Sequence, residues 1–409
     1  MKRILLAFFS LISYCAFAQL GFSLADGATK VQIPIEVHNN LVVVPVIVNN
    51  QLPLKFIVDT GVRTSILTQK VFSDILHLAY TKKYTIAGAG GVNTVNAYIT
   101  NNVTLDLPGV HGRGHAMLVL ETDYLELRNT LGSDVHGILG YELFSRFVVK
   151  IDYDAKLLTL MAPNKFKPKK SFTRLPITVE DTKPYYVAEV KINDTASISA
   201  KLMVDTGASH GLFLDTDSND KIVVPKKNIT CVIGRGLGGL ITGRTARIKS
   251  LRVGKYEVTD MIANFPDPLA VKDTLRLGSG RVYRNGSLGG EILSRFQVIF
   301  DFPREKIYLK AKPGFRKRPY YNMSGLTVKA DGPRLREFEV TEVRSNSAGE
   351  QAGVLVGDRI MSINNNPTVD MDLSQLNNYF NTKPGKKVRM LIKRNSQLLE
   401  KELQLFSEI

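Results

Sequence analysis

The chain has 409 residues, of which 44% are hydrophobic and 22% are charged. These proportions are ordinary for a globular protein and exclude a disordered or fibrous chain. The formal net charge is +16, and part of the excess lies in two short basic stretches, residues 165–170 and 316–318, which are typical of solvated linkers. No nucleic-acid-binding module is recognisable, so nucleic acid is not an expected partner. The charge is instead compatible with loose association with an anionic membrane surface.

The first 18 residues have the pattern of a secretory signal peptide. Two basic residues precede an apolar stretch, residues 4–15, and Ala-Phe-Ala at 16–18 is a cleavage motif. The stretch is shorter than the about 20 residues that a membrane span needs. We therefore predict a signal peptide over residues 1–18 and export to the periplasm or the medium, with a retained anchor as the alternative. Removal leaves Cys231 as the only cysteine, which we expect to be an inert buried thiol.

Two parts of the chain repeat each other. Residues 134–160 and 284–310 both contain Gly-x-Leu-Gly followed by a Leu-centred stretch that ends in Ser-Arg-Phe. The tripeptide Asp-Thr-Gly also occurs twice, at 59–61 and 205–207, each time after an apolar run. The copies are 146 residues apart for Asp-Thr-Gly and 149 residues apart for Ser-Arg-Phe. Nearly equal offsets at separate motifs indicate an internal duplication.

Both copies are predicted to be mainly β, because short apolar runs rich in β-branched residues alternate with turn residues. The predicted elements, in chain order, are strands over 41–48 and 52–58 and a helix over 141–147, then strands over 185–192 and 198–204 and a helix over 291–296. The predicted units are a first lobe over residues 28–162, a second lobe over residues 172–311 and a C-terminal unit over residues 321–409. Linkers rich in Lys and Pro separate them.

Residues 30–311 resemble a single-chain, two-lobed aspartic protease of the retropepsin-like kind. The resemblance rests on each Asp-Thr-Gly being followed by Gly-x-Leu-Gly, at 137–140 and 286–289. It implies two β-barrel lobes and peptide-bond hydrolysis by a water activated between Asp59 and Asp205. Two carboxylates about 3 Å apart share one proton, because they cannot both ionise cheaply. The ionised member then takes a proton from water, and no metal or other cofactor is expected.

The resemblance also assigns supporting roles around the two aspartates. The residues expected to tie the two loops together and support them are Thr60, Gly61, Thr206, Gly207, Gly140 and Gly289. Where the family has Ser or Ala after the tripeptide, this chain has Val62 and Ala208, neither of which donates a hydrogen bond to a carboxylate. A missing donor leaves a carboxyl pKa higher. We therefore predict a pH optimum less acidic than that of the digestive relatives.

Further candidates lie at the edge of the expected cleft. Arg63 and His210 follow their aspartates closely, and they either border the cleft or are solvent-facing or hydrogen-bonded loop residues. Glycine-rich stretches occur in both lobes where the family has a flap hairpin, and the flap candidates are Gly88, Gly90, Gly91, Gly236 and Gly238. Mobile surface loops are one alternative. A phosphate-binding loop is disfavoured, because strand-like sequence follows where a helix is needed.

Residues 321–409 resemble a PDZ domain of the bacterial type. The resemblance is closest from Ser347 to Asn364, which contains Ala-Gly-Val and Gly-Asp-Arg-Ile. It implies that a peptide C-terminus adds as a strand beside a loop and strand formed by Gly325, Leu326, Thr327 and Val328, next to a helix over 372–380. Thr327 replaces a glycine of the usual loop, and a β-rich domain that only stabilises the lobes is the alternative.

The sequence thus predicts an exported aspartic endopeptidase acting on protein or peptide substrates, with a PDZ domain that recruits them. Both aspartates lie in one chain, so a monomer is expected to suffice. The competing hypothesis is a non-catalytic peptide-binding protein built on a protease scaffold.

Overall fold

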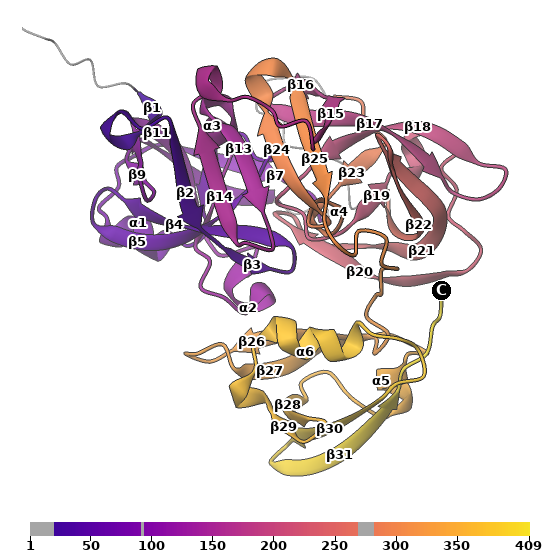
Figure 1. Cartoon of the computed structure of the whole chain (residues 1–409). Coiled ribbons are helices and arrows are strands. Elements are labelled where there is room, and N and C mark those ends of the chain that lie inside the picture. The colour runs from indigo at the N-terminus through magenta and orange to yellow at the C-terminus, as the bar shows by residue number, and fades with distance from the viewer. Residues whose placement is uncertain (1–19, 91–93, 269–281) are drawn as a thin grey trace, which may run out of the picture.

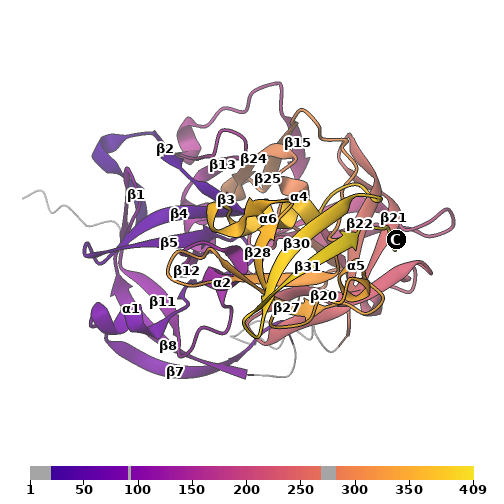
Figure 2. The ribbon, with the colours of Figure 1, turned by 90° about the horizontal axis from the view of Figure 1, so that it is seen from below.

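The computed structural model describes residues 20–90, 94–268 and 282–409. Two β-rich lobes lie side by side, and the C-terminal unit lies beneath them (Figure 1). The same arrangement seen from below places the C-terminal unit in front of the region where the lobes meet (Figure 2). The mainly β fold class expected from the sequence is confirmed. The predicted signal peptide lies outside the described residues.

The first lobe is built around one mixed sheet. Its strands, in spatial order, are β3 (Glu36–His38), β4 (Leu41–Val48), β5 (Leu52–Val58), β12 (Gly137–Leu139), β6 (Ser65–Leu67), β11 (His115–Leu120), β8 (Thr94–Val103) and β7 (Tyr80–Ala87), with β9 (Leu105–Asp106) beside β4. A small sheet pairs β1 (Gly21–Leu24) with β10 (Val110–Arg113). The helices are α1 (Lys70–Ile75), α2 (Leu127–Leu131) and α3 (Tyr141–Arg146).

Local sequence explains the central hairpin of this lobe. β4 and β5 pair as antiparallel neighbours with Val48 opposite Leu52. The turn between them places Asn49 at φ 48° and Asn50 at φ 58°. Asparagine tolerates this left-handed region, and two such residues form the turn whose twist matches a hairpin.

The second lobe repeats this plan. Its strands, in spatial order, are β16 (Thr178–Glu180), β17 (Lys183–Lys191), β18 (Ser197–Val204), β23 (Gly286–Leu288), β19 (Leu212–Leu214), β22 (Tyr256–Pro266), β21 (Gly239–Val253) and β20 (Asn228–Gly236). The short helix α4 spans Gly290–Leu293. β23 pairs in parallel with β18 and antiparallel with β19, just as β12 pairs with β5 and β6 in the first lobe. The lobes are therefore related by a pseudo-twofold arrangement.

A shared sheet joins the two lobes. Its strands, in spatial order, are β15 (Thr173–Pro176), β25 (Lys306–Ala311), β24 (Phe296–Asp301), β13 (Val148–Asp152), β14 (Leu157–Met161) and β2 (Lys30–Pro34). β13 of the first lobe pairs with β24 of the second, with Ile151 opposite Val298. Phe144 packs against Phe300 with ring centroids 5.5 Å apart. One continuous hydrophobic core therefore spans both lobes and fixes their relative position.

The C-terminal unit has its own sheet and core. The strands, in spatial order, are β26 (Leu326–Asp331), β27 (Glu337–Val343), β28 (Arg359–Ile363), β30 (Lys387–Arg394) and β31 (Gln397–Gln404), with β29 (Asn366–Pro367) beside β28. The helices are α5 (Ala348–Gln351) and α6 (Leu373–Phe380). Asp372 and Gln375 form a reciprocal capping box at the start of α6. Among the described residues, no helix is both long and apolar enough to cross a bilayer.

Candidate active site

Asp59 and Asp205 lie directly after the ends of two equivalent strands, β5 and β18. The backbone N–H of Asp59 donates to the carbonyl oxygen of Leu139 at 2.9 Å, and the N–H of Asp205 donates to that of Leu288 at 2.9 Å. Leu139 and Leu288 end β12 and β23, the strands of the two Gly-x-Leu-Gly motifs. Both aspartates are therefore held by the same local backbone geometry.

Thr60 and Thr206 connect the two loops across the junction of the lobes. The Thr60 hydroxyl donates to the Val204 carbonyl oxygen at 2.6 Å, and the Thr206 hydroxyl donates to the Val58 carbonyl oxygen at 2.8 Å. Each hydroxyl also accepts from the backbone N–H of the other threonine, at 3.1 Å and 3.0 Å. Both side chains are fully buried. This reciprocal set fixes the two aspartate loops relative to each other.

The glycines of the two tripeptides let the aspartates approach. The N–H of Gly61 donates to Asp59 Oδ1 at 2.6 Å, and the N–H of Gly207 donates to Asp205 Oδ1 at 3.0 Å. A Cβ on Gly207 would lie 2.1 Å from the carboxyl carbon of Asp59, and a Cβ on Gly61 would lie 3.2 Å from Asp205 Oδ1. Each carboxyl group thus lies over the glycine of the opposite loop. A side chain at position 207 would displace the carboxyl group of Asp59.

The electrostatic environment favours a protonated carboxyl group in this pair. Burial raises the pKa of Asp59 well above the usual range of an aspartate, and the negative charge of Asp205 raises it further. Burial also raises the pKa of Asp205, opposed by the hydrogen bond from Gly207. The two side chains interact directly, so the titration belongs to the pair. Such a pair retains a proton at a pH where an isolated aspartate has lost it.

Two cations near the aspartates were not singled out from the sequence. The positive charges of Arg284 and Lys183 both lower the pKa of Asp205, and Lys183 also acts on Asp59. Arg284 stands two residues before the Gly-Ser-Leu-Gly motif. In a chain with 54 Lys and Arg residues, that position carries no distinguishing pattern.

Gly140 and Gly289 lie beneath the two loops. A Cβ on Gly140 would meet the carbonyl oxygen of Val62 at 2.4 Å, and a Cβ on Gly289 would meet that of His210 at 2.3 Å. The loop backbones therefore rest directly on these glycines. In the second lobe, the N–H of Gly290 donates to the Ala208 carbonyl oxygen at 2.6 Å.

The two residues proposed for the cleft edge have different surroundings. Arg63 is exposed and forms an ion pair with Asp181 of the second lobe at 3.5 Å. His210 Nε2 is hydrogen-bonded to the Ser287 hydroxyl at 2.9 Å, and its ring stacks on Phe213 with centroids 3.5 Å apart. Burial lowers the pKa of His210 to about 3. His210 is therefore a neutral, hydrogen-bonded loop residue near neutral pH, while Arg63 carries its charge at the surface.

The tips of the two glycine-rich hairpins touch each other. The N–H of Gly238 donates to the Ala89 carbonyl oxygen at 2.8 Å. The backbones pass so closely that added Cβ atoms would clash: one on Gly90 would lie 2.1 Å from the Gly239 carbonyl oxygen, and one on Gly236 would lie 2.2 Å from that of Ala89. A Cβ on Gly88 would lie 2.5 Å from Leu237 Cβ. The fifth flap candidate, Gly91, lies outside the described residues.

The peptide-accepting edge predicted for the C-terminal unit is strand β26, which lies at the end of its sheet. Gly325 precedes it at φ 72°, a conformation that favours glycine. The N–H of Leu326 donates to the Ser324 hydroxyl at 3.1 Å, and the Leu326 carbonyl oxygen accepts from Asn322 at 2.7 Å. Thr327 donates to Glu342 at 2.9 Å, and Val328 is buried. The backbone groups of Leu326 are thus satisfied by neighbouring side chains.

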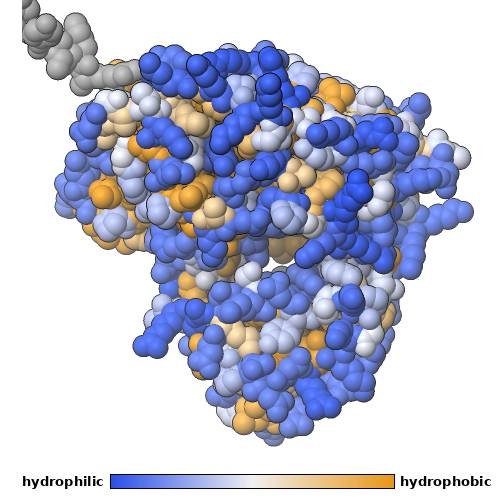
Figure 3. Space-filling model, viewed as in Figure 1, coloured by the Kyte–Doolittle hydropathy of each residue, from blue (hydrophilic) through white to orange (hydrophobic). Residues whose placement is uncertain are grey.

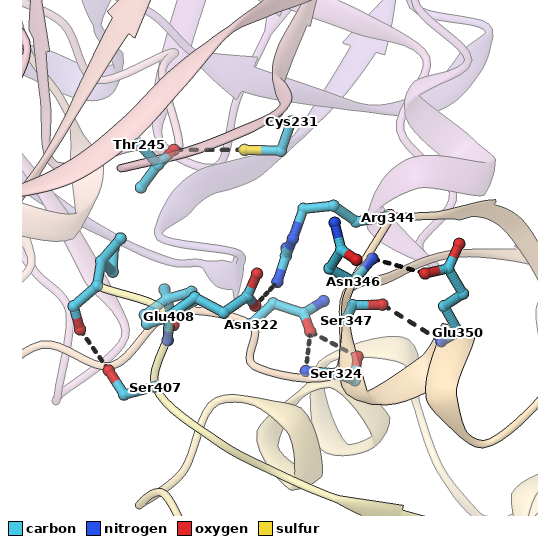
Figure 4. A network of polar contacts seen from close by, with 12 residues as sticks. Cys231, Thr245, Asn322, Ser324, Arg344, Asn346, Ser347, Glu350, Ser407 and Glu408 are labelled. Carbon is cyan, nitrogen blue, oxygen red and sulfur yellow. Dashed lines mark hydrogen bonds and ion pairs between the residues drawn. The ribbon is translucent and has the colours of Figure 1, made fainter. Parts of the chain in front are cut away.

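The C-terminal unit also contacts the second lobe around a cavity of about 380 Å³. Its lining includes Ile229, Cys231, Tyr320, Leu326, Glu342 and Arg344. Figure 3 shows the hollow between the C-terminal unit and the lobes on one face. Figure 4 shows Arg344 directed at Glu408, with which it forms an ion pair. Cys231 Sγ lies 3.4 Å from the Thr245 hydroxyl, and burial raises the pKa of this thiol, which keeps it in the less reactive protonated form.

Comparison with protein families places these features in a known context. The aspartyl protease family matches residues 44–143 and again residues 188–291, and the two segments contain Asp59 and Asp205 respectively. The PDZ domain family matches residues 339–394, from β27 to the end of β30. A search of curated proteins found no match. The chain therefore belongs to the aspartyl proteases of the retropepsin-like kind, with two such domains followed by a C-terminal PDZ domain.

Proposed function

We propose that this protein is an aspartic endopeptidase in which Asp59 and Asp205 activate a water molecule between them. The observation that carries the proposal is the pair of crossed hydrogen bonds from Thr60 and Thr206, which hold the loops of the buried Asp59 and the partly buried Asp205 against each other. This arrangement is preorganised, because the hydroxyl and the backbone N–H of both threonines have their partners inside the protein. A pair that shares a proton supplies a base and an acid at the same site.

The chemical step follows from that shared proton. The ionised carboxylate accepts a proton from the bound water as its oxygen attacks the carbonyl carbon of the peptide bond. The protonated carboxyl group donates a hydrogen bond to the carbonyl oxygen, on which negative charge develops. The resulting intermediate collapses when the leaving nitrogen is protonated and the C–N bond breaks. Neither aspartate is assigned a fixed role, because the proton belongs to the pair.

The remaining parts have supporting roles in this proposal. The hairpins whose tips meet at Ala89 and Gly238 are flaps that exclude water once a substrate is bound. The PDZ domain recruits an extended peptide along β26. The pattern of residues 1–18 supports export, in which case the working compartment is the periplasm or the medium.

Replacement of each aspartate by asparagine tests the proposal. We expect Asp59→Asn and Asp205→Asn each to lower kcat/KM on a random peptide library by at least roughly 10²-fold, the range of general acid–base catalysis. Asp217→Asn is the control, because Asp217 is an exposed aspartate of the second lobe. Cleavage that survives both substitutions would show that the pair is not the catalytic group. The absence of cleavage by the wild-type protein at any pH would favour a peptide-binding protein.

A further inference from the structure

Residues 121–134 of the first lobe, here called the junction segment, connect β11 to β12 and include α2. This segment lies against the PDZ domain (Figure 1). The side chain of Asn129 donates to the carbonyl oxygen of Ala330 in β26 at 2.8 Å. Arg128 donates to the carbonyl oxygens of Gly332 and Pro333 at 3.5 Å and 3.3 Å. The junction segment therefore satisfies backbone acceptors at the far end of the edge strand.

The junction segment also enters the space between β26 and α6. A Cβ on Gly132 would lie 2.7 Å from Leu373 Cβ, at the start of α6, and 3.5 Å from Ala330 Cβ. Met323, before β26, donates from its N–H to the Phe380 carbonyl oxygen at the end of α6, at 3.2 Å. The strand and the helix therefore lie side by side, with Leu326 and Phe380 at one end. The first lobe covers the opposite end.

The other side of the junction segment holds the second flap. Arg235 of β20 donates to the Tyr124 carbonyl oxygen at 3.4 Å and lies 3.5 Å from the carboxylate of Glu126. Leu237, at the tip of this hairpin, packs against the same hydrophobic cluster as Tyr124 and Leu127. One short segment thus contacts the PDZ edge on one side and the tip of a flap on the other.

The position of Asn129 sets a length limit for a bound peptide. A strand that pairs antiparallel with β26 and ends opposite Leu326 reaches Ala330 with its fifth residue from the end, because paired strands advance one residue at a time. At that point the Ala330 carbonyl oxygen is already taken by Asn129. A peptide of four residues competes only with the Ser324 and Asn322 side chains that bind Leu326, whereas a longer one also meets Asn129 and Gly132 of the junction segment.

We propose that an extended peptide of five or more residues competes with the junction segment for the edge of β26 and, by displacing it, releases the second flap. The PDZ domain is then more than a tether: the flap is held while the edge of β26 is free and is released when a long peptide pairs with it. The effect on cleavage rests on the proposed function, but the competition and the release of the flap do not.

Binding by full-length protein carrying Asp59→Asn, in which no probe is cleaved, tests the competition. The probes are a random decapeptide library with free C-termini, the best-binding decapeptide, and its last four residues as a tetrapeptide. Adding Asn129→Ala should raise the affinity for the decapeptide roughly 2- to 10-fold, the worth of one hydrogen bond, and leave that for the tetrapeptide unchanged. Asn101→Ala, an exposed asparagine of the same lobe, is the control. Equal effects on both peptides, no effect on either, or no binding by the library would overturn the proposal.

Amide hydrogen exchange in the same Asp59→Asn protein tests the release of the flap. The decapeptide, and separately the Arg128→Ala substitution, should speed exchange of residues 236–239 several-fold, while the tetrapeptide and Asn101→Ala should not. Unchanged exchange in the presence of bound decapeptide would overturn the coupling. In the wild-type protein, a non-cleavable decapeptide should raise the turnover of a second substrate. If the wild-type protein cleaves nothing, the proposed function fails, while the binding and exchange results still decide the competition.

Discussion

The two lobes share one backbone frame around the candidate aspartates but differ in the charges and polar groups that surround it. Asp59 and Asp205 directly follow equivalent strands and accept equivalent hydrogen bonds. The positive charge of Lys183 lowers the pKa of both aspartates, whereas the positive charge of Arg284 is among the causes that lower the pKa of Asp205. Duplication has thus preserved the geometry that brings two carboxyl groups together, while the electrostatic environment has diverged.

A second difference lies in how each lobe supports its loop. In the second lobe, the hydroxyl of Ser287 is hydrogen-bonded to His210. In the first lobe the same motif position is Ile138, which packs in a hydrophobic cluster. Hydrophobic packing and hydrogen bonding therefore perform the same supporting task on the two sides. The comparison predicts equal effects for changes in the frame and unequal effects for changes in the surroundings.

The largest effect is expected from removing the crossed hydrogen bonds of Thr60 or Thr206, which hold the two aspartate loops together. Thr60→Val and Thr206→Val each remove a hydroxyl that both donates and accepts within the protein, and leave a buried carbonyl oxygen and N–H without partners. We expect each to lower the free energy of unfolding by about 2–4 kcal/mol, and to nearly equal extents. Denaturant unfolding measures this. Thr85→Val, on an exposed strand surface, is the control and should change stability by less than about 0.5 kcal/mol. Clearly unequal losses in the free energy of unfolding would show that the two threonines do not contribute equally.

The next effect concerns stability as a function of pH. A carboxyl pKa raised by folding contributes stability that is complete below the unfolded value of about 3.9 and is lost as pH rises through the folded value. Asp59→Asn removes this loss, so the variant should gain stability relative to the wild type as pH rises from about 4 to 7. Each unit of raised pKa corresponds to about 1.4 kcal/mol. Denaturant unfolding across this range, with Asp217→Asn as control, measures the difference. A difference that stays constant with pH would contradict the raised pKa of Asp59.

A smaller effect is expected from removing the positive charge of Arg284, which acts on Asp205. Arg284→Met removes a positive charge that lowers the pKa of Asp205. Both limbs of the pH profile of kcat/KM should therefore move to higher pH. Arg244→Met, an exposed arginine of β21, is the control and should leave the profile in place. A shift to lower pH after Arg284→Met would refute this account.

The smallest effect tests the residues that follow the tripeptides. Val62 and Ala208 donate no hydrogen bond to the carboxyl groups, so a serine at either position adds a donor that favours the ionised form. Ala208→Ser and Val62→Ser should move the acidic limb of the profile to lower pH. The wild-type profile should peak above about pH 3. A wild-type optimum below that value would rule out the explanation.

Much of the fold could be predicted from local sequence. The strands predicted over 41–48 and 52–58 are β4 and β5, and the predicted helix over 372–380 is α6 with Asp372 as its N-cap. These elements follow from alternating apolar residues, turn asparagines and a capping residue, all of which act within a few positions. The family and the PDZ domain were likewise readable, because the paired motifs and the PDZ stretch are contiguous in sequence.

The residues that surround the candidate site could be predicted less well from the sequence. Arg284 and Lys183 were missed, because a basic residue near a motif is common in this chain. His210 was proposed either at the cleft or as a hydrogen-bonded loop residue, and only its contacts with Ser287 and Phe213 show which groups surround it. The contacts of the junction segment left no signal in the sequence, because they depend on how separate domains dock.

By itself, the sequence determined the duplication, the strands that present the two Asp-Thr-Gly loops and the division into two lobes and a PDZ domain. Only the tertiary structure decided that the Thr60 and Thr206 hydroxyls cross between loops 146 residues apart, that the tips of the two glycine-rich hairpins meet at Ala89 and Gly238, and that Asn129 covers the end of β26. The physical reason is the separation along the sequence over which each effect acts. Backbone preferences and side-chain periodicity act over a few residues, whereas the meeting of distant loops depends on the β13–β24 pairing and the shared core that set the lobes in place.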